Sequence, residues 1–246
     1  MLRSMLLGLS LIAVLIAAAA CDASPINVLT GSGTVRSESR PVSAFDEVEL
    51  AGIGALTITQ GQQESLTVEA EDNLLPTIRS EVRGRRLVIE LDGGRTVHVR
   101  PTKPIKYTVT VRDLTAVKLS GAGSVAIPSL TTATLDLRMS GAGDVALDGL
   151  TAGELTLSLS GLGDATVSGT VTRQEVTMSG LGSYRAEHLE SQEARVTKSG
   201  AGNATVRVSS TLNVKASGAG TVEYIGDPTV SQDISGAGRV RQIAGR

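Results

Sequence analysis

A four-residue motif, Ser-Gly-(Ala/Leu)-Gly, recurs through the C-terminal half of the chain at nearly constant spacing. Successive copies are separated by 20, 20, 19, 20, 18 and 18 residues. A period of about 20 residues is typical of a solenoid, in which each repeat forms one coil stacked on the previous coil. The serine and two glycines of the seven copies are Ser120, Gly121, Gly123; Ser140, Gly141, Gly143; Ser160, Gly161, Gly163; Ser179, Gly180, Gly182; Ser199, Gly200, Gly202; Ser217, Gly218, Gly220; and Ser235, Gly236, Gly238.

Apolar and polar residues alternate on both sides of each motif, which is the pattern of β-strands with one face in a core. Three columns are expected to point inward. The column one residue before each serine contains Leu119, Met139, Leu159, Met178, Lys198, Ala216 and Ile234. The column three residues before contains Val117, Leu137, Leu157, Val176, Val196, Val214 and Gln232, and the column five residues after contains Val125, Val145, Ala165, Tyr184, Ala204, Val222 and Val240. The sequence therefore predicts an all-β, single-stranded parallel β-helix with coils of about 18–20 residues.

The motif itself is expected to form the corners of the coil. Glycine suits a sharp corner because it tolerates positive φ and close approach of another backbone segment. The serine hydroxyl could bond to the serines above and below it, or it could cap the turn.

The segment Ala51-Gly52-Ile53-Gly54 is a degenerate eighth copy, because the residues before it match those before Ser120 position for position. Residues 60–112 separate it from the regular array and break the period. They contain alternating strand patterns, and Leu74–Ile78 suggests a short helical turn or a loop. We interpret 60–112 as irregular coils of the same solenoid, with a separate domain as the alternative.

The N-terminus has the pattern of a secretory signal. Arg3 precedes an apolar run that ends in three alanines immediately before Cys21, the single cysteine of the chain. An exported protein with one thiol is unusual, and attachment of a diacylglycerol to Cys21 would explain it. Ala18 departs from the usual lipobox leucine, so ordinary cleavage remains the alternative. Polar residues 21–40 then read as a tether.

Composition excludes some classes of function. The net charge of −2 and the lack of a basic cluster argue against nucleic-acid binding. Trp is absent, and the aromatic residues are Phe45, Tyr107, Tyr184 and Tyr224. Carbohydrate grooves and protein-binding hot spots depend on aromatic side chains, so a deep sugar cleft is not expected.

Several features together resemble one known family, the auto-transporter adhesin head GIN domain. They are the leader, Phe45-x-x-Val48-x-Leu50, Asn73–Pro76, Leu87–Ile89 and the stacked Ser-Gly-x-Gly motifs. The resemblance covers most of residues 40–240. It implies a right-handed, single-stranded β-helix on an exported and often lipid-anchored bacterial envelope protein. It brings no catalytic residues with it.

The candidate sites each have a structural alternative. Asp144 and Asp164 follow two motifs and should stack about 5 Å apart, which suits a shared Ca²⁺, yet Asp is also a common turn residue. Lys198 stands in an apolar column, where we expect either a bulge or an ammonium that reaches solvent. His98 and His188 have no evident partner ligands and are expected on the surface.

The sequence thus predicts a signal peptide (1–20), a lipid-anchored tether (21–40) and a β-helix domain (41–246) with regular coils over 113–243. The predicted function is a non-enzymatic adhesion, interaction or scaffold role in the envelope of a Gram-negative bacterium, on its outer or inner membrane. No cofactor is expected, and the partners are the membrane and an envelope protein, surface protein or glycan. A polysaccharide-active enzyme and a structural periplasmic component are the alternatives.

Overall fold

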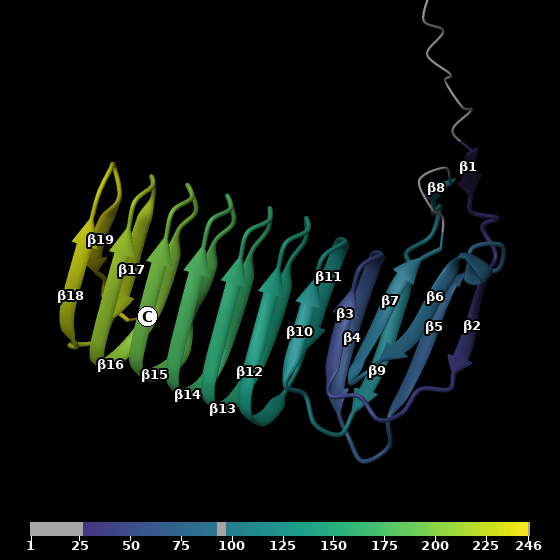
Figure 1. Cartoon of the computed structure of the whole chain (residues 1–246), viewed down its shortest axis with the longest axis horizontal. Helices are drawn as coiled ribbons and strands as arrows, with labels where there is room; N and C mark the ends of the chain where they lie inside the picture. Colours follow the sequence, from purple (N-terminus) through teal and green to yellow (C-terminus); the bar gives the residue numbers. More distant parts are fainter. Residues whose placement is uncertain (1–26, 93–96, 246) are drawn as a thin grey trace, which may run out of the picture.

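The computed structural model describes residues 27–92 and 97–245. Parallel strands stack in register to form a β-solenoid of about six turns, seen from the side in Figure 1. The predicted fold class is therefore confirmed. The leader and Cys21 lie outside the described residues.

The regular part of the solenoid repeats two strand columns joined by a corner. Its strands are β10 (Ala116–Leu119), β11 (Ala122–Ile127), β12 (Leu130–Met139), β13 (Val145–Leu159), β14 (Ala165–Met178), β15 (Tyr184–Lys198), β16 (Ala204–Ala216), β17 (Thr221–Ile225), β18 (Thr229–Ile234) and β19 (Arg239–Gln242). One column runs toward the Ser-Gly-x-Gly corner and the other runs away from it. The corners form the upper row of loops in Figure 1.

The degenerate motif at Ala51 is a true corner of the same stack. Strand β3 (Glu47–Leu50) pairs with β10 and places Val48 beside Val117. Strand β4 (Ile53–Gln60) pairs with β11 and places Gly54 beside Gly123. The corners are adjacent in space although about 70 residues separate them in sequence, so the predicted eighth copy is confirmed.

Residues 60–112 continue the solenoid and then cover its end. Strands β7 (Arg86–Leu91) and β9 (Lys106–Val111) pair in parallel with β3 and β4. Strands β5 (Ser65–Glu71) and β6 (Ile78–Arg83) run antiparallel to β9 and β7. The predicted short helical turn is the 3-10 turn η1 (Leu75–Thr77). All four strands belong to the same 17-stranded sheet as the regular coils.

Part of the expected tether is folded. Strand β1 (Asn27–Thr30) pairs with β8 (Val97–Arg100), and β2 (Val35–Arg40) runs antiparallel to β5. Strand β2 lacks an apolar face, and most of its side chains are exposed, which is why its sequence resembles a linker. The Arg40 guanidinium donates to the carbonyls of Leu75 and Ile78 and fixes β2 to the turn η1.

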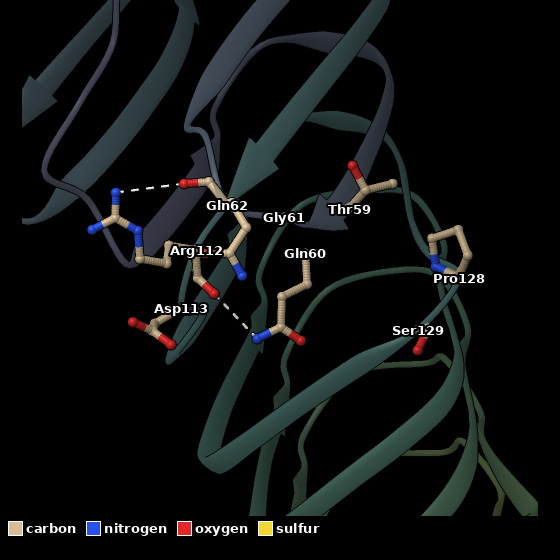
Figure 2. Close-up of a pocket in the computed structure, with 8 residues that line it drawn as sticks. All are labelled: Thr59, Gln60, Gly61, Gln62, Arg112, Asp113, Pro128 and Ser129. Atoms are coloured by element: carbon tan, nitrogen blue, oxygen red, sulfur yellow. Dashed lines mark hydrogen bonds between the residues drawn. The ribbon is translucent and has the colours of Figure 1, made fainter.

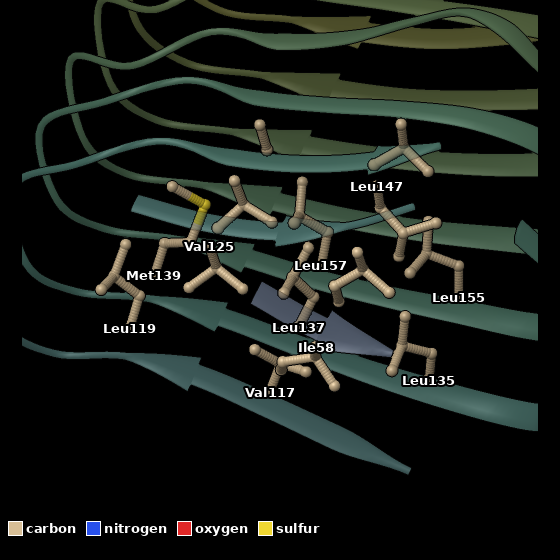
Figure 3. Packing of buried hydrophobic residues seen from close by; sticks show 14 of the residues in the cluster. Ile58, Val117, Leu119, Val125, Leu135, Leu137, Met139, Leu147, Leu155 and Leu157 are labelled. Carbon is tan, nitrogen blue, oxygen red and sulfur yellow. The ribbon is translucent and has the colours of Figure 1, made fainter. Parts of the chain in front are cut away.

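The core fills the coil with three apolar columns, as predicted. Val117, Leu137 and Leu157 lie one above another, and Figure 3 shows them with Leu119, Met139 and Val125. All of the predicted inward residues before the last coil are buried. In the last coil the pattern ends, since Gln232 is exposed and Ile234 is 37% exposed.

Candidate functional site

The glycines of the corners allow neighbouring coils to pack closely. A Cβ atom on Gly141 would lie 1.8 Å from the carbonyl oxygen of Gly121 in the neighbouring coil. Gly161, one coil further, would place its Cβ 1.9 Å from the oxygen of Gly141. The first glycine of these two copies is therefore needed because the neighbouring coil leaves no room for a Cβ atom, and not because its φ is positive. A second glycine such as Gly163 has both a close contact and a φ of 144°.

The serine hydroxyls do not form the ladder that the motif suggested. Ser120 Oγ donates to Glu49 at 2.9 Å, and Ser160 Oγ donates to the carbonyl of Met139 at 3.3 Å. Neither bond joins two serines of neighbouring coils. Ser120 and Ser160 thus donate to acceptors of a neighbouring coil rather than to another motif serine.

The carboxylates of the two aspartates after the corners accept hydrogen bonds from backbone amides. Asp144 Oδ1 accepts the amide of Asp164 at 2.9 Å, and Asp164 Oδ1 accepts the amide of Ser183 at 2.9 Å. Arg185 lies 2.7 Å from the other oxygen of Asp164. Partial burial raises the pKa of Asp164, but the Ser183 amide and the Arg185 guanidinium outweigh it and hold this pKa below its ordinary value. These contacts favour the turn role over the calcium role.

No metal cluster is formed by the residues that the structure describes. Within 27–92 and 97–245, His, Cys, Asp and Glu side chains do not come together in groups of three or more. His98 on β8 and His188 on β15 are both exposed, as expected.

The expectation that Lys198 lies at a bulge or extends its ammonium to solvent is wrong. Lys198 stays in register between Met178 and Ala216, so there is no bulge at this position, and only 1% of it is exposed, so the ammonium does not reach solvent. Instead the ammonium donates to the corner carbonyls of Gly200, at 2.9 Å, and Ala219. Burial lowers the pKa of Lys198. The corner itself supplies the acceptors that a buried lysine needs.

A buried hydrogen-bonded chain crosses three coils, and the sequence analysis missed it. Tyr184 donates to Gln174 Oε1 at 3.0 Å, Gln174 Nε2 donates to Ser191 at 2.8 Å, and Ser191 donates to the carbonyl of Arg207 at 2.7 Å. Gln174 stands in register between Leu155 and Ala194 in an inward column. A polar residue in that column was the available signal. Each buried side-chain nitrogen and oxygen in this series of hydrogen bonds has a hydrogen-bond partner, which indicates a structural role.

Glu71 forms a second buried polar centre that the sequence did not reveal. Its carboxylate accepts amides from Gly33 at 2.6 Å, Thr102 at 2.8 Å and Lys103 at 3.3 Å, together with the Thr102 hydroxyl at 2.5 Å. The Thr102 hydroxyl and these amides lower the pKa of Glu71 to about 2. The carboxylate joins the loop before β2 to the loop after β8.

An open cavity of about 580 Å³ lies where the irregular and regular coils meet (Figure 2). Gln60 lines it, donating to Arg112 O at 3.2 Å and to Thr131 O at 3.0 Å, and accepting the Thr131 amide. Arg112 and Asp113 are exposed at its rim. The lining is polar and includes no aromatic side chain. It offers hydrogen bonds to a polar surface group.

None of the helical segments in the described ranges has the length and apolar character needed to span a membrane.

Comparison with known proteins places the chain in a family. Residues 44–228 match the family described as "Putative auto-transporter adhesin, head GIN domain", and the chain belongs to this family. The resemblance inferred from the motifs is thereby confirmed. None of the curated proteins matches the sequence.

Solved structures show the same fold. A "putative adhesin" from Bacteroides fragilis is 26% identical, with a TM-score of 0.82, and the match covers 87% of this chain and 100% of that chain. A "putative lipid binding protein" from Parabacteroides distasonis is 23% identical, with a TM-score of 0.70, 88% of this chain and 100% of that chain covered. A "putative adhesin" from Parabacteroides merdae is 18% identical, with a TM-score of 0.69, covering 88% of this chain and 99% of that chain.

Proposed function

We propose that the protein is a non-enzymatic, adhesin-like module of the bacterial envelope that presents the outside of its solenoid to a partner. Membership of the GIN-domain family is the observation that carries this proposal. The name of the Bacteroides fragilis protein, at 26% identity, supports the same class of function.

The outer surface suits binding by extended contact. Outward side chains of successive coils stack in rows, and one such row contains Asp136, Thr156, Glu175 and Arg195. Oppositely charged residues also pair between coils, as in Arg173 and Glu193 at 2.9 Å. The rows carry polar side chains and charges of both signs, which favours a polar partner such as an envelope protein, a surface protein or a glycan.

The contacts of the residues first considered for chemistry support a non-enzymatic role. The carboxylates of Asp144 and Asp164 accept backbone amides, and Lys198 is enclosed by carbonyl groups. A polysaccharide-active site would need carboxylates free to reach substrate. Adhesion therefore fits these contacts better than glycoside cleavage.

We also propose that Cys21 is lipidated and that residues 1–20 are removed. The leader pattern and the position of the single cysteine support this. In Figure 1 the described chain begins with β1 at one end of the solenoid, so an anchor there would leave the long outer faces free. The envelope of a Gram-negative bacterium is the proposed location.

Labelling of growing cells with a palmitate analogue tests the anchor. Wild-type protein is expected to carry the label, and Cys21→Ser is expected to lose it. Mature wild-type protein that carries no label would refute lipidation without touching the proposed binding role.

Competition tests the binding role. Cells that express the protein are incubated with immobilised envelope or matrix components, with and without purified solenoid as competitor. The proposal predicts that the purified solenoid reduces binding, whereas heat-denatured solenoid does not. Equal binding with and without the native competitor, on every component tried, would count against adhesion.

A further inference from the structure

The two ends of the solenoid are built differently. At the N-terminal end, the antiparallel strands β5 and β6 and the turn η1 close the coil, and Leu75 and Ile78 of this layer are buried. The outermost strands there are β2, which exposes Arg36 and Glu38, and β6, which exposes Arg79 and Glu81. Charged side chains on an edge strand oppose pairing with another chain. This end is covered.

The last coil, at the left of Figure 1, has no such cover among the described residues. Strand β18 pairs with β16 and β19 pairs with β17, while their outer edges have no strand partner in residues 27–92 and 97–245. The inward side chains of this last coil are also exposed to solvent. Ile234 is 37% exposed, whereas Ala216, at the same position one coil earlier, is 5% exposed.

We propose that a second copy of this chain covers the open end, tail to tail. Strand β18 runs toward the last corner and β19 runs away from it. A two-fold axis along that direction therefore places β18 antiparallel to β19 of the partner subunit, and β19 antiparallel to the partner's β18. Both edges of the last coil gain backbone hydrogen bonds in one isologous contact.

The side chains fix the register of this pairing. Inward residues must lie opposite inward residues, because directly opposed side chains share a face. Registers two residues apart meet this condition, and the one that also brings the two apolar residues together places Ile234 opposite Val240 of the partner subunit and Gln232 opposite Gln242 of the partner subunit. Between them, Asp233 faces Arg241 of the partner subunit. Apolar, amide and oppositely charged groups are each matched with their complement.

Arg241 is able to make this contact. Its Nε donates to Glu223 of the same chain at 2.9 Å, which orients the guanidinium on the outer face of β19. A guanidinium has five N–H donors, so some remain for a second carboxylate. The alternative in which β19 lies against β19 of the partner subunit would oppose Arg239 and Arg241 to arginines, and like charges across strands are destabilising.

The covered N-terminal end limits the assembly to two copies. A head-to-tail contact would leave an open end and would continue into a filament. A tail-to-tail contact uses both open ends at once and leaves only covered ends. The structure thus favours a closed dimer, with the two proposed anchors at opposite ends of a doubled rod.

Sedimentation velocity tests the dimer, using residues 21–246 with Cys21→Ser over a wide range of concentration. We expect a dimer that dissociates on dilution. Ile234→Lys/Val240→Lys should shift it to the monomer, whereas Val35→Lys, on the exposed edge strand at the other end, should leave it dimeric. A monomer at all concentrations, or a dimer that Ile234→Lys/Val240→Lys leaves intact, would overturn the proposal.

Disulfide trapping tests the register and does not depend on the charged variants folding. Ile234→Cys and Val240→Cys are each made in the Cys21→Ser background and are oxidised separately and as a mixture. Covalent dimers should form efficiently only in the mixture, because residue 234 faces residue 240 of the partner subunit. Efficient trapping of Ile234→Cys with itself would contradict the register.

Discussion

At the scale of single residues, polar side chains in the inward columns differ in their environment. Gln174 is buried in a hydrogen-bonded chain, Lys198 donates to corner carbonyls, and Gln232 is exposed in the last coil. Departures from the column pattern could be found in the sequence. Their partners could not, because these partners come from neighbouring coils and from backbone carbonyls that have no sequence signal.

Replacing Lys198 by methionine should stabilise the solenoid by about 1 kcal/mol at neutral pH. The change removes a desolvated charge and continues the apolar column that contains Met178. The gain should shrink as the pH rises toward 10.5, the ordinary pKa of lysine. The folded-state pKa is lowered, so the unfolded chain binds more protons in this window, and wild-type stability rises with pH. Thermal melts of the two proteins at several pH values measure the difference, and a constant difference would contradict the argument.

Gly141→Ala should destabilise the protein by about 2–3 kcal/mol, because the added methyl group would overlap the carbonyl oxygen of Gly121. Ala142→Ser is the matched control, since Ala142 is the exposed tip of the same corner. Chemical denaturation compares the two. If Gly141→Ala unfolds at the same denaturant concentration as wild type, close approach between coils is not the reason for the motif.

Glu71 should make the N-terminal end sensitive to acid. Its pKa is lowered from 4.5 to about 2, so its contribution to stability is complete above about pH 4.5 and is lost as the pH falls toward 2. Glu71→Gln should lack this contribution already at neutral pH and should show a flatter pH profile between 4.5 and 2. Amide hydrogen exchange at Gly33 and Thr102 reports the change locally. Equal pH profiles for wild type and variant would exclude this role.

At the scale of strands and corners, the register was predictable because the same residue types return at the same offset in each coil. The match of Val48 and Leu50 with Val117 and Leu119 was sufficient to align β3 with β10 across about 70 residues. Strand β2 was not predictable, since its side chains are exposed and only its backbone pairs with β5. An edge strand without an apolar face has no periodicity to detect.

The chain of hydrogen bonds through Gln174 should couple β14, β15 and β16 energetically. Gln174→Leu leaves the buried hydroxyl of Tyr184 without its acceptor and should cost about 2 kcal/mol. Tyr184→Phe removes that hydroxyl, so the double variant should be less destabilised than the sum of the two single changes. A double-mutant cycle by denaturant unfolding measures this coupling. Strict additivity would mean that the bond contributes nothing.

At the scale of the whole molecule, the residues that build the solenoid differ from those that could bind a partner. Corners and columns are used for stacking, and what remains for a partner is the outer surface, which the repeat leaves free to vary. This explains why the fold was predictable from the sequence and the ligand was not. The fold depends on a motif that recurs seven times at a spacing of 18–20 residues, with a degenerate eighth copy upstream. A binding face depends on a few outward side chains that any polar residue would replace without harm to the stack.

One comparison of strains separates a surface-binding role of the solenoid from an enzymatic role. Binding of whole cells to envelope and matrix components is measured for the wild type, for a deletion strain and for a strain with Asp144→Ala/Asp164→Ala. The account predicts that the deletion strain loses binding, while the double alanine strain, if its protein is present at wild-type level, binds as the wild type does. A deletion strain that binds normally, together with cleavage of an acidic polysaccharide that Asp144→Ala abolishes, would contradict it.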